Sequence, residues 1–283
     1  MLCYNITLTN PARYDTFSSF TLSPYAADTL GSVARLWRSV AACPAVGRHP
    51  LGHIVAMITL NNLVTGYAGK TLTCPLNGAF RPGSPTAIVG VNGCGKSTLL
   101  KTLAGFLPPL SGSVSWPGDK KIIGWLPQQN ELNHDFPLTV SDVVAMGAWP
   151  AAALTKSLRG ETLSRIDAAL EQVGLTALRR HTLNRLSGGQ FQRMLFARLL
   201  VQDAPIMLMD EPFTGIDSQT SDALLEVMAT LNARGKTLLV VLHNQQMVHR
   251  HFPETLWLHQ GHYRWGQTAS VLPPPSACPL PQD

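Results

Sequence analysis

One run of residues has the composition and spacing of a phosphate-binding loop. Residues 90–98 read Gly-Val-Asn-Gly-Cys-Gly-Lys-Ser-Thr and fit the pattern G-x-x-x-x-G-K-[ST]. Its glycines let the backbone curl, so that successive N–H groups point inward at a helix N-terminus and can hold phosphate oxygens. Lys96 would bring a positive charge to the β- and γ-phosphates, and Ser97 would offer a hydroxyl to Mg²⁺. The residues expected to contact a nucleoside triphosphate here are Gly90, Asn92, Gly93, Cys94, Gly95, Lys96, Ser97 and Thr98.

Two adjacent carboxylates follow an apolar run that has the composition of a buried strand. The run Ile206–Met209 is followed directly by Asp210 and Glu211. In open α/β sheets, ligands bind at the carboxyl ends of the strands. We expect Asp210 to hold Mg²⁺ through water, and Glu211, which points in a different direction, to polarise an attacking water as a general base. The pair therefore indicates hydrolysis of the bound nucleotide.

A second glycine-containing turn lies at Leu186–Gln190. Ser187, Gly188 and Gly189 precede a helix that we expect to begin near Gln190, where N–H groups and a hydroxyl form a second anion-binding spot. Taken alone, this turn would be an ordinary helix N-cap. Its presence beside a phosphate loop and paired carboxylates favours a role in binding the nucleotide.

These motifs need a scaffold, and the rest of the sequence predicts an α/β fold. Short β-branched runs alternate with stretches of helical periodicity. The expected strands are Thr86–Val89, Ile206–Met209 and Thr237–Leu242. The expected helices are Lys96–Gly105, Val140–Gly147, Glu161–Gly174, Gln190–Val201 and Ser218–Ala233. The first strand leads into the phosphate loop, and the second delivers the two carboxylates.

The two ends of the chain differ from this pattern. Residues 1–56 show neither a sustained period of 2 nor one of 3.6, whereas an alternating strand pattern begins at Met57. We expect a disordered or misannotated leader over 1–56 and a folded domain over 57–272; the alternative is an added regulatory segment at the N-terminus. Residues 273–283 are proline-rich and are expected to form a tail.

The overall composition narrows the class of protein. Charged residues make up only 14% and hydrophobic residues 45%, which excludes disorder driven by high charge. A net charge of +5 is too small and too scattered to indicate a nucleic-acid binder. No apolar run is long enough to span a bilayer.

The five cysteines form no CxxC pair, so a reducing cytoplasm is expected. Cys94 is expected to be a small filler residue in its loop, the alternative being a redox-sensitive brake on nucleotide binding.

Together and in this order, the motifs resemble those of the nucleotide-binding subunit of an ABC transporter. The resemblance covers Met57 to about Leu272. It implies a P-loop NTPase with a RecA-like core, a small antiparallel β subdomain and a helical subdomain inserted at about residues 130–190. It also implies ATP and Mg²⁺ as ligands, and ATP hydrolysis as the reaction.

The resemblance assigns further residues one by one. Tyr67 matches the aromatic residue that stacks on adenine. Gln128 matches a glutamine that binds Mg²⁺ and water and senses the membrane partner, with Gln129 as the competing assignment. Asp217 matches the loop that crosses the dimer interface, and His243 matches the histidine that contacts the γ-phosphate.

Two positions depart from the family pattern. Val91 stands where proline is frequent, and Asn244 follows His243 where aspartate is usual. Neither departure removes a group expected to take part in the reaction.

The resemblance also implies an assembly. One chain carries one phosphate loop and one Leu186–Gln190 signature, and in this family each site pairs the loop of one subunit with the signature of the other. It therefore implies a homodimer beneath integral-membrane permease subunits, peripheral on the cytoplasmic face of the inner (plasma) membrane. A periplasmic or lipoprotein metal-binding protein would be an indirect partner, and no nucleic acid is expected.

Three segments resemble importers of zinc or manganese, although importers of iron chelates and haem share part of the pattern. They are Asp135–Gly147, Phe191–Arg198 and His251–Leu256. A rival interpretation is a soluble ABC ATPase acting on nucleic acid or ribosomes, but the chain shows no heptad insertion and no basic arm. A metal-sensing role for His249, His251, His259 and His262 is less favoured than solvated polar residues, because no carboxylate or cysteine partners accompany them at firm spacing.

Overall fold

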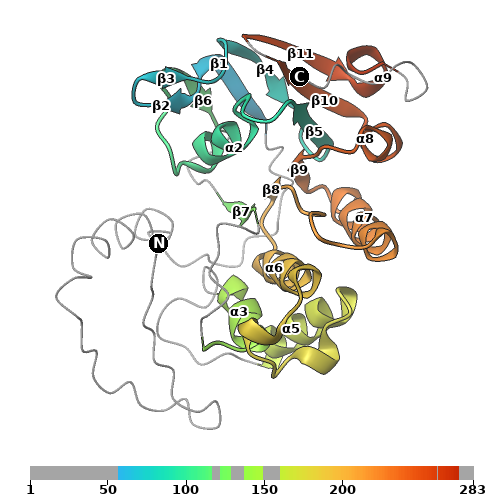
Figure 1. Ribbon diagram of the computed structural model, residues 1–283. Coiled ribbons are helices and arrows are strands. Elements are labelled where there is room, and N and C mark those ends of the chain that lie inside the picture. The colour runs from blue at the N-terminus through green and yellow to red at the C-terminus, as the bar shows by residue number, and fades with distance from the viewer. Residues whose placement is uncertain (1–56, 117–121, 129–136, 149–159, 260, 274–283) are drawn as a thin grey trace, which may run out of the picture.

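The computed structural model describes residues 57–116, 122–128, 137–148, 160–259 and 261–273 (Figure 1). Within these residues the main sheet has six strands in the order β11-β10-β5-β9-β8-β7. All neighbouring pairs are parallel except β10 and β11, which form an antiparallel hairpin. The strands are β5 (Pro85–Gly90), β7 (Ile123–Leu126), β8 (Ile206–Asp210), β9 (Thr237–Val241), β10 (Glu254–His259) and β11 (His262–Gln267).

A smaller antiparallel sheet lies over one face of the main sheet. Its strand order is β4-β1-β6, and a short hairpin of β2 and β3 lies beside it. Helix α2, which follows β5, packs between the two sheets, because its leucines share one buried cluster with residues of both. The elements are β1 (Ile58–Val64), β2 (Gly66–Tyr67), β3 (Lys70–Thr71), β4 (Leu76–Phe80), α2 (Lys96–Ala104) and β6 (Ser111–Ser115).

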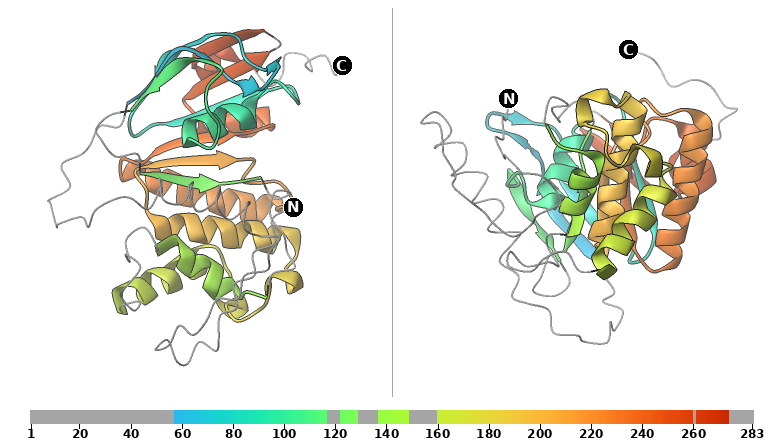
Figure 2. Two further views of the ribbon diagram at one scale, coloured as in Figure 1. Left: turned by 90° about the vertical axis from the view of Figure 1, so that its left-hand side faces the viewer. Right: turned by 90° about the horizontal axis from the view of Figure 1, so that it is seen from below.

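The opposite face of the main sheet is covered by helices, as the left view of Figure 2 shows. The α-helices are α3 (Val140–Ala145), α5 (Gly160–Gln172), α6 (Gly188–Gln202), α7 (Ser218–Ala233), α8 (Gln245–His251) and α9 (Thr268–Val271). Three short 3₁₀ helices join them in the described residues: η3 (Met146–Ala148), η5 (Thr176–Leu178) and η6 (Leu183–Arg185).

The central strands are buried on both faces, and this explains their continuous apolar sequences. In β8, Leu208 packs into the cluster with α2, whereas Met207 and Met209 pack into the cluster with the helices on the other face. In β9, Leu239 packs into the cluster with α2, and Val240 packs into the cluster with the helices on the other face. Alternation of side chains along each strand therefore links the two halves of the core.

The predicted α/β fold is confirmed, and the predicted strands correspond to β5, β8 and β9. The predicted start of one helix was wrong: α6 begins at Gly188 instead of near Gln190. The reason is a capping box, in which the side chains of Ser187 and Gln190 each accept a hydrogen bond from the other residue's backbone N–H. The turn that we expected before the helix is its first turn.

No helix in the described part of the chain is long and apolar enough to cross a membrane. The predictions for residues 1–56 and for the tail after Pro273 lie outside the described residues. So do Gln129 and part of the predicted helical subdomain.

Candidate functional site

The phosphate loop connects the carboxyl end of β5 to the first turn of α2. Gly93 and Gly95 have φ angles of 79° and 98°, in the left-handed region that favours glycine. A Cβ atom at Gly95 would lie 3.0 Å from the Cβ of Leu72 and 3.2 Å from the Cγ2 of Thr73. Glycine is therefore needed at Gly95 both for the turn and for the close packing of the chain after β3 against the loop.

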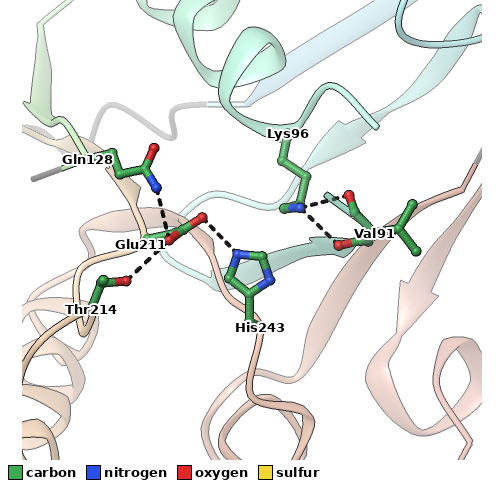
Figure 3. A network of polar contacts seen from close by, with 7 residues as sticks. Val91, Lys96, Gln128, Glu211, Thr214 and His243 are labelled. Carbon is green, nitrogen blue, oxygen red and sulfur yellow. Dashed lines mark hydrogen bonds and ion pairs between the residues drawn. The ribbon is translucent and has the colours of Figure 1, made fainter. Parts of the chain in front are cut away.

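Lys96 lies within this loop and not on the open surface. Its side chain is buried, and its Nζ donates hydrogen bonds to the carbonyl oxygens of Gly90 at 2.9 Å and Val91 at 3.0 Å (Figure 3). The ammonium group is thus held beside the backbone that would surround a phosphate group. Ser97 and Thr98 follow in α2, partly exposed and buried respectively, while Asn92 and Gly93 are exposed.

Cys94 is buried inside the loop. A Cβ atom at Gly90 would lie 2.8 Å from its Sγ, so the thiol fills space next to the glycine. Burial raises the pKa of the Cys94 thiol, although the charge of Lys96 acts in the opposite direction. A raised pKa disfavours the thiolate that a redox-sensitive brake would need, and this supports the filler role.

The two carboxylates at the end of β8 have different environments. Asp210 is the last residue of the strand and is fully buried. Glu211 has a φ of 50°, an uncommon value for a residue other than glycine. This left-handed turn directs the Glu211 carboxylate away from the strand, as expected for two acids with different tasks.

Glu211 is the centre of a polar network drawn from three parts of the chain (Figure 3). His243, which follows β9, places its Nε2 2.7 Å from the Oε1 of Glu211. Gln128, which follows β7, donates through Nε2 to the Oε2 of Glu211 at 3.1 Å. Thr214 donates its hydroxyl to the same oxygen at 3.2 Å.

The network determines the ionisation of Glu211. Burial alone would raise the pKa of this carboxyl group. That effect is outweighed by the hydrogen bond to His243, by the charge of His243 and by the hydrogen bonds from Thr214 and Gln128. The pKa of Glu211 therefore lies below its ordinary value. Glu211 is therefore a carboxylate at neutral pH.

The turn that includes Ser187 and Gln190 packs against the loop before α7. The backbone N–H of Gln190 donates to the Oγ of Ser187 at 3.2 Å, and the N–H of Ser187 donates to the Oε1 of Gln190 at 2.9 Å. A Cβ atom at Gly189 would lie 2.8 Å from the carbonyl oxygen of Gly215. Gly189 thus permits this close contact, a packing role that the motif alone did not indicate.

Asp217 and Asn244 both cap helices. Asp217 caps α7, and its carboxylate accepts from the N–H and the hydroxyl of Thr220, each at 2.8 Å. These two bonds, together with the charge of Arg193, lower the pKa of Asp217. Asn244 caps α8 by accepting a hydrogen bond from the N–H of Met247 at 3.1 Å. Asparagine in place of the usual aspartate therefore still caps the helix.

The structure brings some of the predicted residues together and leaves others apart. Gln128, Glu211 and His243 are in direct contact, and Lys96 lies in the same region (Figure 3). Tyr67 lies on the β2–β3 hairpin with 48% of its surface exposed. In Figure 1 the turn at the start of α6 lies with the helices, away from α2 and the smaller sheet.

Thr214 is a site residue that the sequence reasoning missed. Its signal was its position three residues after Glu211, but the contact depends on the left-handed backbone at Glu211.

The oxygen donors near the loop fit a magnesium ion. Ser97, Gln128 and Asp210 offer hydroxyl, amide and carboxylate oxygens, which are the hard ligands that Mg²⁺ prefers. Within the described residues, no group of three or more His, Cys, Asp and Glu side chains could hold a metal ion. His249 bonds to the carbonyl oxygen of Pro273 at 3.0 Å, and His259 faces His262 across the β10–β11 hairpin.

A phosphate loop between β5 and α2, with paired acids at the end of β8, which β9 separates from β5 in the sheet, defines a P-loop nucleoside triphosphatase. The family model described as "ABC transporter" matches residues 74–214. The chain belongs to the ABC transporter family, as an ATP-binding subunit that hydrolyses ATP.

Relatives and a solved structure support this assignment. The chain is 39% identical over 206 residues to the zinc transport system ATP-binding protein TroB of Treponema pallidum, covering 71% of this chain and 77% of that protein. It is 36% identical over 220 residues to the manganese transport system ATP-binding protein MntB of Bacillus subtilis, covering 76% and 88%. A solved inward-facing structure of a putative metal-chelate type ABC transporter matches with a TM-score of 0.68 and 28% identity, covering 77% of this chain and 85% of that one. The resemblance identified from the motifs is confirmed.

Proposed function

We propose that this chain is the ATP-hydrolysing subunit of a membrane importer for a divalent metal cation, zinc or manganese. The observation that carries the proposal is its 39% identity to a zinc transport ATP-binding protein and 36% identity to a manganese one. Both matches extend over about three quarters of this chain. The family model, which matches residues 74–214, includes the phosphate loop, the carboxylate pair and the helices between them.

The loop and its neighbours would bind the nucleotide. Backbone N–H groups of the loop and the Lys96 ammonium would hold the phosphates, because both already converge at the start of α2. Exposed Tyr67 would stack on the adenine ring. Oxygens of Ser97 and Gln128 would hold Mg²⁺, with Asp210 acting through water. The ion would neutralise charge on the phosphate oxygens.

Glu211 would act as the general base for the attacking water. Its lowered pKa keeps it ionised, and His243, 2.7 Å from Glu211, would orient the water and contact the γ-phosphate. In the structure, both carboxylate oxygens of Glu211 are engaged by His243, Gln128 and Thr214. Gln128 contacts Glu211 through its Nε2, so its Oε1 would remain available to Mg²⁺ without loss of that bond.

A complete site would need two copies of the chain. Each chain carries one phosphate loop and one turn of Ser187–Gln190, and in Figure 1 the two lie in different parts of the fold. We propose a head-to-tail homodimer in which this turn of one copy closes on the loop of the other, with Asp217 at the interface. Two permease subunits would hold the dimer on the cytoplasmic face of the inner membrane, and a periplasmic or lipoprotein metal-binding protein would deliver the cargo.

Measuring metal uptake by cells tests which cargo the transporter imports. Deleting the gene should abolish high-affinity accumulation of radioactive zinc or manganese, and the wild-type chain should restore it whereas Lys96→Ala should not. The structural likeness to a metal-chelate transporter favours a second candidate, import of an iron chelate or haem. Normal zinc and manganese uptake in the deletion strain, with loss of chelate uptake, would replace the first candidate by the second.

A further inference from the structure

Strand β7 is the edge strand of the main sheet, and helix α6 bonds to its backbone. Within the described sheet, β7 pairs only with β8. The Nη2 of Arg198 donates to the carbonyl oxygen of Trp125 at 3.0 Å. The Nε2 of Gln202 donates to the carbonyl oxygen of Ile123 at 3.0 Å. Two side chains of one helix thus occupy acceptors that a further strand would otherwise use.

The spacing of these two bonds matches the geometry of the two elements. Arg198 and Gln202 are four residues apart on one helix face, a rise of about 6 Å. Ile123 and Trp125 are two residues apart on one strand edge, a rise of about 6.6 Å. The donors and acceptors are therefore in register, and together they oppose both sliding and rotation of β7 against α6.

Packing around the two bonds is tight. A Cβ atom at Gly124 would lie 2.5 Å from the Cδ1 of Leu199 and 3.3 Å from the Cβ of Ala204, so glycine lets α6 approach the strand closely. Burial lowers the pKa of the Arg198 guanidinium. On its other side, Trp125 packs edge-on against Phe106, which lies just beyond α2, with ring centroids 5.3 Å apart.

Helix α6 therefore links three parts of the proposed site. Its first turn is Ser187–Gln190, where Gly189 contacts Gly215 in the loop before Asp217. Its last two turns hold β7, and Gln128 lies two residues after the end of that strand. Gln128 in turn bonds to Glu211.

We propose that Arg198 and Gln202 are positioning residues. Through their bonds to β7, they let helix α6 determine the position of Gln128. Movement of α6, when its first turn meets the nucleotide of the partner copy, would be transmitted through β7 to Gln128 of its own site. The two sites of a dimer would thereby be coupled through one helix in each chain. The coupling of the two sites rests on the proposed function. The two hydrogen bonds from Arg198 and Gln202 to β7, which we call the clamp, can be measured without nucleotide.

Hydrogen–deuterium exchange of the nucleotide-free full chain tests the clamp. Arg198→Met and Gln202→Met each remove the donor and keep an apolar stem. Either change should speed exchange in the segment 122–128 about tenfold, because a bond to the strand is lost. Arg165→Met is the matched control, since Arg165 also donates to a backbone carbonyl oxygen, but that of Val201 on α6 instead of one on β7. Unchanged exchange over 122–128 in Gln202→Met, or equal acceleration in the control, would overturn the inference.

A double-mutant cycle on ATP hydrolysis tests the link to Gln128. Gln202→Met should lower kcat about fivefold in the wild-type background but less than about twofold in a Gln128→Ala background, because the effect acts through Gln128. Equal losses in both backgrounds would show a general structural effect and overturn the inference. Gln202→Met provides this test even where Arg198→Met reduces folding. Absence of hydrolysis by the wild-type chain would instead contradict the proposed function, and the exchange experiment would still report on the clamp.

Discussion

At the scale of single residues, the site is built around one carboxylate that the protein keeps ionised. Glu211 combines a left-handed backbone with three polar neighbours, one of which, Thr214, belongs to its own loop. The roles proposed for Gln128 and His243 come from the family resemblance. Their contact with Glu211 follows from geometry, because the strands β7, β8 and β9 are parallel neighbours and their carboxyl ends meet at one edge.

Thr214→Val tests whether the Thr214 hydroxyl lowers the pKa of Glu211, the proposed general base. Removing a hydrogen bond that lowers the pKa of Glu211 should raise that pKa, so that the acid limb of the kcat profile moves to higher pH. We expect kcat at neutral pH to change by less than about twofold, because Glu211 stays ionised there, and the loss to appear on the acid limb. Measured pH profiles of ATP hydrolysis check this expectation.

The control for Thr214→Val is Thr230→Val. Thr230 is an exposed residue of α7 whose hydroxyl bonds only to the carbonyl oxygen of Glu226. An acid limb that stays in place in Thr214→Val, or that moves equally in the control, would show that the hydroxyl has no influence on the base.

At the scale of elements, local signals predicted five of the described helices and the central strands, but not α8, α9 or how the elements meet. Continuous apolar runs marked β5, β8 and β9, because strands covered on both faces have no polar side. The start of α6 was misplaced because the sequence Ser-Gly-Gly-Gln was interpreted as an anion-binding turn before the helix, whereas it is also a capping box.

Contacts between distant segments could not be inferred from local sequence. The smaller sheet pairs Ile58 with Phe80 and Thr59 with Ser115, and neither register is encoded by a local motif. The bonds from α6 to β7 were missed for the same reason, since Arg198 and Gln202 looked like ordinary helix residues.

Gly189→Ala tests the packing of α6 against the loop before α7. The added methyl group would meet the carbonyl oxygen of Gly215 at 2.8 Å, and this backbone can yield only by moving the loop. We expect the free energy of unfolding to fall by about 1–3 kcal/mol, measured by urea denaturation. Gly160→Ala is the control, because a Cβ atom there would have no neighbour within 4 Å. Equal stability of the two variants would contradict the packing role.

At the scale of the whole molecule, the described residues form two apolar clusters, one on each face of the main sheet. The four arginines and two aspartates of residues 1–56 contribute +2 to the net charge of +5. We propose that residues 57–272 are the working unit and that the leader is not needed for catalysis.

A chain beginning at Met57 tests this proposal. It should fold with the same midpoint of thermal unfolding as the full chain and should hydrolyse ATP at a rate within about twofold, because every described helix and strand lies after Met57. Comparing the two chains by calorimetry and by phosphate release checks both points. A shorter chain that aggregates or is inactive would show that the leader is an integral, regulatory part of the protein.

ATP hydrolysis by Glu211→Gln tests the central claim most directly. This substitution keeps the shape of the side chain but removes the carboxylate that accepts the proton, so the account predicts Mg²⁺-dependent hydrolysis about 10³-fold slower than in the wild type, with ATP still bound and the dimer closed. A Glu211→Gln chain that hydrolyses ATP at the wild-type rate would contradict the assignment of Glu211 as the base and the mechanism built on it.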